Sequence, residues 1–288
     1  MAMSEKVAIL SDSTSDLNRE LIDKYDVKLV SLKVNLGEKE YLDGVDIHPD
    51  MIYEHYKNTG ELPKTAAVNV AEFADAIEPL VKAGKEVVVF TIGSQMSSTY
   101  NNACLAAEEF DNVYVVDTQN LSTGIGLLII AAAEMAEKGM GAAEIAKECD
   151  ALAKRVDASF VIDSLEFLYK GGRCSALAAF GANALQLKPC IAVRGGKMGA
   201  IKKYRGRFGD VLKKYVADQI GDASDIETDH IIVTHAGCDE SIYMACYEQV
   251  KAYGIFKNVH LTRAGCTISS HCGQHSLGVL FIRKNEVK

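Results

Sequence analysis

Paired cysteines are missing from this sequence, although it contains 8 cysteines in 288 residues. None of them forms a Cys-x-x-Cys pair, and their spacing shows no disulfide framework. Scattered, unpaired cysteines are typical of a reducing compartment, so we expect the protein to be cytoplasmic. The N-terminal residues lead directly into an apolar strand and show no apolar core of a signal peptide, which favours the same location.

Long apolar runs, basic surfaces and nucleotide motifs are also missing. The longest apolar run, residues 125–133, is too short to span a bilayer, so we expect no membrane span. The net charge is −8, from 31 basic and 39 acidic residues, and no basic stripe carries aromatic residues. This pattern argues against a nucleic-acid partner. Gly124-Ile-Gly126 lacks the third glycine of a dinucleotide motif and is better explained by close packing, so no cofactor is expected.

What the sequence does contain is an alternation of short apolar strands with helices. Buried strands are predicted at residues 7–10, 87–90 and 112–117, each followed by a polar loop. Residues 27–36 also alternate, and we interpret them as one further strand. The alternation predicts an N-terminal α/β domain with a Rossmann-like parallel sheet. Because ligands bind at the carboxyl edge of such sheets, the three polar loops should converge on a site.

The pattern changes near residue 157. Beyond it, helices accompany hairpin-like strands, and Gly195-Gly196 lies between two alternating runs as in a tight turn. We therefore predict two domains, residues 4–157 and 158–288. The second should be an α+β domain with a mixed or antiparallel sheet, and it should include a helix of small residues at 174–187.

One loop in the N-terminal domain is rich in hydroxyl groups. It follows the strand at 87–90, precedes a helix predicted at 100–110, and contains Ser94, Ser97, Ser98 and Thr99. The free N–H groups and the positive end of the helix dipole make such a loop a receptor for negative charge. An ordinary helix N-cap would explain one or two of these hydroxyls. Four hydroxyls exceed what one cap needs, which favours a ligand.

A serine hydrolase is one alternative, with Ser97 as the nucleophile. Its base would be His271 or His275, and its orienting carboxylate Asp12 or Asp117. The loop lacks the Gly-x-Ser-x-Gly elbow of many hydrolases, which weighs against this interpretation.

A metal site is a second alternative, because residues 266–275 contain two cysteines and two histidines. Their spacing matches no standard zinc pattern, and buried cysteine commonly behaves as a small apolar residue, so we predict no metal. Arg173, directly after Gly171-Gly172, either binds a buried carboxylate or stabilises the end of a helix. A receptor for another anionic ligand also remains open.

Several motifs occur in a fixed order along nearly the whole chain. They are Asp12-Ser-Thr14, Pro63-Lys-Thr65, Ser94-x-x-Ser97-x-Thr-Tyr-x-x-Ala103, Asp117 with Ser122-x-Gly-x-Gly126, Leu165-x-x-Leu-x-x-Gly-Gly-Arg173, Leu187-Lys-Pro189, Lys203-Tyr-Arg-Gly206, and Gly265 through His271 to Gly278. In this order and spacing the chain resembles the DegV family of bacterial fatty-acid-binding proteins. The resemblance implies a binding protein, not an enzyme, whose two domains bury one long-chain fatty acid such as palmitate between them.

The resemblance also implies roles for individual residues. Thr65 and Ser97 would hydrogen-bond the carboxylate of the acid, with Ser98 or its N–H nearby, and Arg173 and His271 would support the same end.

In the characterised branch of the family, the protein presents the acid to a fatty acid kinase for phospholipid synthesis, which would place Arg205 at the kinase-facing surface. Asp12 and Asp117 should face away or be paired, because like charges repel the ligand. The chain departs from the family pattern at Ala66, Ser98 and Cys272, around both ends of the site.

Overall fold

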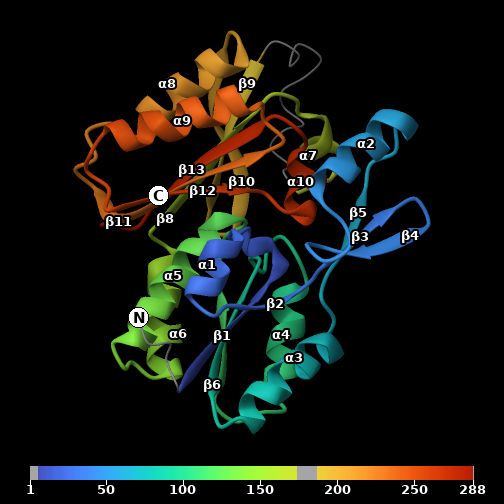
Figure 1. The fold of residues 1–288 in the computed structure, drawn as a ribbon, viewed down its shortest axis with the longest axis vertical. Coiled ribbons are helices and arrows are strands. Elements are labelled where there is room, and N and C mark those ends of the chain that lie inside the picture. The colour runs from blue at the N-terminus through green and yellow to red at the C-terminus, as the bar shows by residue number, and fades with distance from the viewer. Residues whose placement is uncertain (1–5, 174–186, 288) are drawn as a thin grey trace.

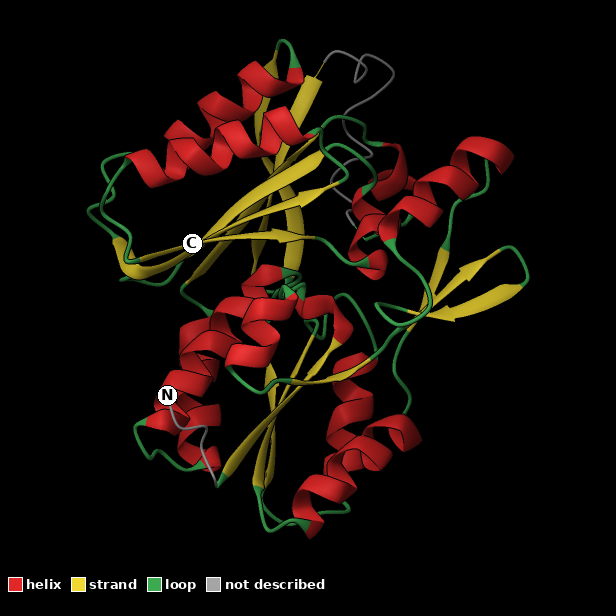
Figure 2. Ribbon diagram, viewed as in Figure 1, coloured by secondary structure: helices red, strands yellow, loops and turns green. Residues whose placement is uncertain are grey.

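The computed structural model describes residues 6–173 and 187–287. Its helices and strands form two stacked halves, with a small sheet and a helix projecting at one side (Figures 1 and 2). The fold is α/β, as the sequence predicts, with a parallel sheet in the N-terminal half and a mixed sheet in the C-terminal half.

The N-terminal sheet has four parallel strands in the order β2-β1-β6-β7. They are β1 (Val7–Asp12), β2 (Lys28–Val30), β6 (Glu86–Thr91) and β7 (Val113–Asp117). The central strands β1 and β6 are almost wholly buried, as apolar strands are where helices cover both faces of a sheet. Strand order changes direction between β1 and β6, so the loops after β1, β6 and β7 open at one edge, as predicted.

Helices cover both faces of this sheet. They are η1 (Ser13–Ser15), α1 (Arg19–Lys24), α3 (Val70–Lys82), α4 (Thr99–Ala107), α5 (Thr123–Glu137) and α6 (Ala142–Ala153). Helices α3 and α4 pack with Leu10 and Val89, and helices α5 and α6 pack with Ile9 and Phe90 on the opposite face. Helix α6 was not identified from the sequence.

The C-terminal sheet has six strands in the order β10-β9-β8-β13-β11-β12. They are β8 (Val156–Ile162), β9 (Leu187–Arg194), β10 (Lys197–Arg205), β11 (Ile226–Ala236), β12 (Asn258–Arg263) and β13 (Ser276–Arg283). All neighbours are antiparallel except β11 and β12. Gly195 and Gly196 have φ angles of 52° and 77° and form the predicted tight turn. The helix expected at 174–187 lies outside the described residues, apart from Leu187, which begins β9.

Helices α8 (Phe208–Ile220) and α9 (Glu240–Ala252) cover the outer face of the six-stranded sheet (Figure 1). Its inner face packs against α5, where Ile125 and Leu127 belong to the same apolar cluster as Phe160 and Leu280 of the C-terminal sheet. A helix that is apolar on every side suits this position between two sheets. The two halves thus share one continuous core, and the domain boundary at residue 157, which falls at the start of β8, remains our proposal.

A third sheet, in the order β4-β3-β5, projects beside the interface between the halves. It comprises β3 (Lys33–Leu36), β4 (Lys39–Leu42) and β5 (Lys64–Ala66), and α2 (Pro49–Thr59) follows β4. The prediction of one strand over residues 27–36 was wrong, because β2 and β3 belong to different sheets. Between them, Ser31 Oγ donates to Asp43 O and Leu32 N donates to Ser13 Oγ, so the backbone leaves one sheet before it enters the other.

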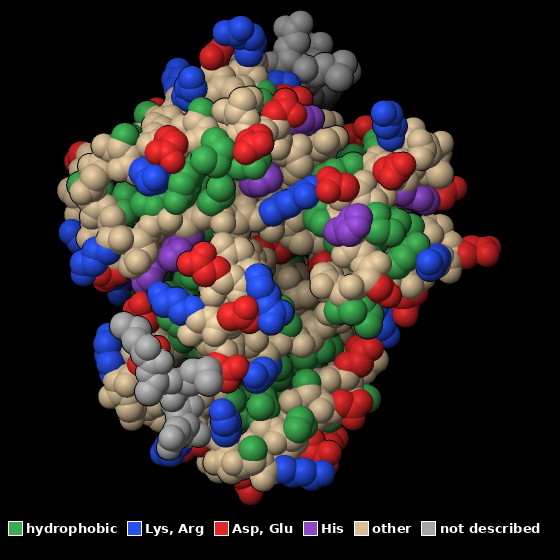
Figure 3. All heavy atoms as spheres, in the orientation of Figure 1, with side chains coloured by type: hydrophobic (Ala, Val, Ile, Leu, Met, Phe, Trp, Pro, Cys, Tyr) green, Lys and Arg blue, Asp and Glu red, His purple; other side chains and the backbone are tan. Residues whose placement is uncertain are grey.

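Acidic and basic side chains alternate over the face shown in Figure 3, and neither sign forms a large field there. Among residues 6–173 and 187–287, no helix has both the length and the apolar character that crossing a bilayer requires.

Carboxylates of the N-terminal half hold the start of a short C-terminal helix, α10 (Cys266–Cys272). Asp43 accepts hydrogen bonds from the backbone N–H groups of Cys266 and Thr267 at 2.8 and 2.9 Å, and Asp16 accepts one from Gly265 at 2.8 Å. The first N–H groups of a helix have no partner within the helix, so these bonds satisfy them and join the two halves.

We expect Asp43→Asn to destabilise the protein by about 1–3 kcal/mol, because an amide offers only one acceptor oxygen to the two buried N–H groups. Urea denaturation at pH 7 measures the loss. Asp23→Asn is the matched control: Asp23 pairs with Arg19 on an exposed helix surface, and its substitution should change stability by less than about 0.5 kcal/mol. Equal stabilities of the two variants would contradict this account.

Candidate functional site

A cavity of about 210 Å³ lies between the two halves, beside the third sheet. All five residues predicted to bind a ligand line it: Thr65, Ser97, Ser98, Arg173 and His271. They come from β5, from the loop before α4, from the residues after α7 (Glu166–Lys170) and from α10. The structure therefore brings these five together, although their roles remain predictions. Arg205 does not line this cavity and is exposed on β10.

The hydroxyl-rich loop is anchored by two carboxylates at the carboxyl ends of its neighbouring strands. Asp12 accepts a hydrogen bond from Ile92 N at 2.7 Å, and Asp117 accepts bonds from Ser94 N and Ser94 Oγ at 3.0 and 2.6 Å. Burial raises the pKa of Asp12 to about 6. We predicted that Asp12 and Asp117 would face away or be paired, and both are occupied by hydrogen bonds from the loop. Both carboxylates hold the loop in place.

Ser97 and Ser98 occupy the end of this loop, directly before α4. Ser97 Oγ lies 2.9 Å from Thr99 Oγ1 and accepts a bond from Thr99 N at 3.2 Å. Ser98 is the N-cap residue, yet its side chain makes no capping hydrogen bond. One of the two hydroxyls therefore partly serves its own helix, as the N-cap alternative predicted, and the other remains available to a ligand.

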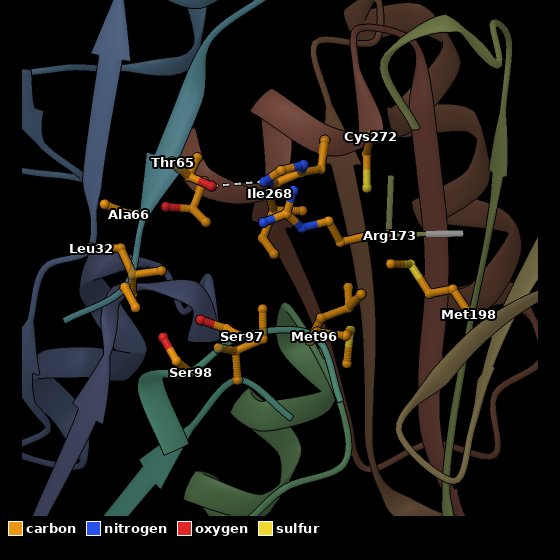
Figure 4. A pocket seen from close by; sticks show the side chains of 15 residues that line it. Leu32, Thr65, Ala66, Met96, Ser97, Ser98, Arg173, Met198, Ile268 and Cys272 are labelled. Carbon is orange, nitrogen blue, oxygen red and sulfur yellow. Dashed lines mark hydrogen bonds between the residues drawn. The ribbon is translucent and has the colours of Figure 1, made fainter. Parts of the chain in front are cut away.

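Thr65 and His271 form the opposite wall. Thr65 Oγ1 lies 2.8 Å from His271 Nε2, a contact between β5 and α10 that Figure 4 draws as a dashed line. Burial, and to a smaller extent the charge of Arg173, lower the pKa of His271 to about 4, so the ring is neutral at pH 7. A neutral imidazole has one donor and one acceptor nitrogen. Donation from Nε2 to Thr65 would leave the threonine proton free for a ligand.

The His271 ring is closely packed on the side of its Nδ1 atom, against Gly171. The ring Nδ1 is buried and has no hydrogen-bond partner among the described residues. A Cβ atom on Gly171 would lie 2.8 Å from that nitrogen, so only glycine lets the ring occupy this place. Arg173, two residues further on, donates to Gly171 O at 2.7 Å, and its guanidinium reaches toward Thr65 in Figure 4.

Apolar and sulfur-containing side chains complete the wall, among them Leu32, Met96, Met198 and Cys272. A second cavity of about 30 Å³ adjoins the first, and Leu121, Ile268 and Cys272 line both. Most of its remaining lining is apolar, from Ala158, Phe160, Val193, Ala236, Ala264, Leu277 and Leu280. The site thus combines a polar chamber with an apolar extension into the interface between the halves.

The hydrolase alternative gains no support from this geometry. Ser97 Oγ is engaged with Thr99, and in the described part of the chain no hydrogen bond joins it to His271 or His275. His275 contacts Phe208 in an edge-to-face arrangement and does not line the cavity.

Residues 266–275, considered above for metal binding, form α10 and the turn after it. Cys266 and Cys272 are buried in apolar clusters. Within the described residues, no three His, Cys, Asp or Glu side chains are arranged to hold a metal ion.

Sequence analysis did not single out Thr267, Met96 or Met198, which also line the cavity. Thr267 lies inside the segment that suggested metal ligands, and its position on a helix would have been needed to place it beside His271. The two methionines carry no signal in sequence that distinguishes a cavity wall from an ordinary core.

Comparisons with known proteins agree on one family. A family model described as an uncharacterised protein of the DegV family matches residues 6–284. A DegV domain-containing protein of Clostridium perfringens is 31% identical over 284 residues, which cover 97% of this chain and 99% of the relative.

Solved structures show the same fold. A structure described as fatty acid binding of a DegV family protein from Thermus thermophilus has a TM-score of 0.88 at 28% identity, covering 96% of this chain and 99% of that one. A stearic acid-binding protein from Eubacterium ventriosum has a TM-score of 0.81 at 30% identity, covering 96% and 98%.

The place of Gly171 beside His271 generates a prediction. In Gly171→Ala the added methyl should displace the ring from its buried position, so the pKa of His271 should rise from about 4 toward its ordinary value of 6.5. An NMR pH titration of the histidine ring signals measures this shift, with His271→Asn used to assign the signal. Gly199→Ala is the control, because no atom lies within 4 Å of its Cβ position. An unchanged titration in Gly171→Ala would refute the steric argument.

Proposed function

Since this chain belongs to the DegV family, we propose that it binds a long-chain fatty acid between its two halves. The observation that carries the proposal is the pairing of a polar chamber, lined by hydroxyl, guanidinium and imidazole groups, with an adjoining apolar cavity. The relatives from Thermus thermophilus and Eubacterium ventriosum, described as fatty-acid-binding and stearic acid-binding, support the same ligand class.

In this proposal the carboxylate lies in the polar chamber. A carboxylate removed from water needs several donors or a paired cation. Thr65, Ser97 and Ser98 supply hydroxyl donors, Arg173 supplies a cation, and His271 orients Thr65. Because Asp12 and Asp117 are occupied by the loop, their carboxylates are turned to backbone donors instead of the ligand.

The acyl tail lies in the apolar cavity, where each buried CH₂ contributes about 0.8 kcal/mol. At about 30 Å³ this cavity holds no more than one water molecule's share of volume, so its walls must move apart when a tail enters. Leu121, Ile268 and Cys272, which line both cavities, stand at the point of entry. A predominantly polar ligand would leave this apolar extension unused, which favours a fatty acid over another anion.

We further propose that the protein is a cytoplasmic carrier without catalytic activity of its own, which presents the acid to a fatty acid kinase for phospholipid synthesis. Arg205, exposed on the edge strand β10, is the residue we assign to that partner surface. Native mass spectrometry of freshly purified protein tests the ligand class directly. An adduct with the mass of a long-chain fatty acid is expected.

The double variant Thr65→Ala/Ser97→Ala should bind palmitate at least about tenfold more weakly, because each lost hydroxyl removes a hydrogen bond to a charged group. Its fold should persist, since both side chains are only partly buried. Fluorescence displacement on delipidated protein measures the affinity. Thr59→Ala/Ser224→Ala, which removes two exposed hydroxyls outside the cavity, should bind like the original protein. Full affinity in the first variant would disprove the assignment of the carboxylate.

Binding should also depend on pH through His271. A carboxylate in the chamber favours the charged imidazolium, so the pKa of His271 should be higher in the complex than its value of about 4 in the free protein. Protons are then taken up on binding at pH values between about 4 and the higher pKa of the complex, and affinity increases as the pH falls through that range. Calorimetry in buffers of different ionisation enthalpy measures the uptake. His271→Asn should abolish it, whereas His48→Asn, at an exposed position, should retain it.

A further inference from the structure

Helix α10 carries three hydroxyl side chains, and within residues 6–173 and 187–287 only that of Thr267 lacks a hydrogen-bond partner. Ser269 Oγ donates to Ala264 O at 3.3 Å, and Ser270 Oγ donates to Cys266 O at 2.7 Å. Thr267 is only 3% exposed, and its buried Oγ1 atom has no hydrogen-bond partner among the described residues. Thr267 also lines the polar chamber, unlike the two serines.

Resting on the fatty-acid-binding function proposed above, we propose that Thr267 binds a hydroxyl group of the ligand itself. The ligand class that this position fits is a long-chain acid with a hydroxyl on one of its first carbons, as in 3-hydroxy fatty acids. Thr267 becomes a specificity-determining residue for this class.

The position of Thr267 on α10 places that hydroxyl near the carboxylate. Thr267 and His271 are four residues apart and lie on one face of the helix, with their Cβ atoms about 5–6 Å apart. His271 contacts Thr65 at the carboxylate end of the chamber. Ile268 and Cys272 also border the apolar cavity, whereas Thr267 borders the polar chamber alone. The partner group therefore belongs to the head of the acid and not to its tail.

The carboxylate of an unsubstituted acid already faces the other hydroxyl and guanidinium groups of the chamber, so we assign Thr267 to a second polar group of the ligand. A buried hydroxyl without a partner costs free energy, and valine fills nearly the same volume without that cost. At the second residue of α10, Thr267 has no carbonyl of its own helix four residues earlier to bond, as Ser270 has. A ligand hydroxyl can donate and accept, so it satisfies the threonine hydroxyl whichever way that group points. Sites that hydrogen-bond a ligand hydroxyl discriminate strongly against analogues that lack it.

Calorimetric titration of delipidated protein with palmitate, 3-hydroxypalmitate and 2-hydroxypalmitate tests the inference. The original protein should prefer a hydroxy acid to palmitate, and Thr267→Val should reduce that preference about tenfold, a change of about 1.4 kcal/mol. Thr267→Ser keeps the hydroxyl and should keep the preference. Ser270→Ala, on the same helix but outside the chamber, should also keep it.

Two results would overturn the inference, and they differ in what else they overturn. Equal preference in the original protein and Thr267→Val, with palmitate still bound, removes the role of Thr267 and leaves the fatty-acid function intact. Failure of the original protein to bind any of the three acids removes the proposed function and this inference with it. If Thr267→Val does not fold, the same comparison is made with Thr267→Ala. An unchanged preference for the hydroxy acid in that variant would also overturn the inference.

Discussion

The attachment of helix α10 to two carboxylates of the other half is the constraint on which the site depends. Asp16 and Asp43 accept the N–H groups at the start of the helix, and the helix in turn presents His271 and Thr267 to the cavity. Asp16 is only 6% exposed, and this burial raises its pKa well above the usual range. The shape of the chamber depends on the fixing of a C-terminal helix against the edge of an N-terminal sheet. The positions of the polar groups on that helix depend on the same attachment.

Much of the architecture follows from local sequence. Short β-branched runs such as residues 87–90 become strands buried on both faces, and glycine pairs such as Gly195-Gly196 adopt the positive φ angles of a hairpin turn. The convergence of the loops after β1, β6 and β7 also follows, because parallel strands present their carboxyl ends at one edge. The five residues that the family resemblance selected meet in one cavity, although no local pattern could have joined them.

The features that could not be predicted from the sequence depend on contacts between distant segments of the chain. Residues 27–36 alternate as one strand would, but hydrogen bonds from Ser31 and Leu32 to other loops divide them between two sheets. Helix α6 was not predicted from the sequence, although it buries Ile145 and Cys149 against the N-terminal sheet. The solitary hydroxyl of Thr267 is visible only when its neighbours in space are known, since Ser269 and Ser270 look equivalent to it in sequence.

The contact between Thr65 and His271 joins residues 206 positions apart, and it has a consequence for how long a cargo stays. Under the proposed function, walls from both halves contact the ligand, so its release is coupled to separation of the two halves as well as to the contacts at its carboxylate. By the same coupling, a ligand bound as proposed would hold the halves together, and the melting temperature would rise with the logarithm of the ligand concentration once that exceeds Kd. A fragment containing either half alone carries only part of the cavity wall. Ligand binding by such a fragment therefore does not represent binding by the whole chain.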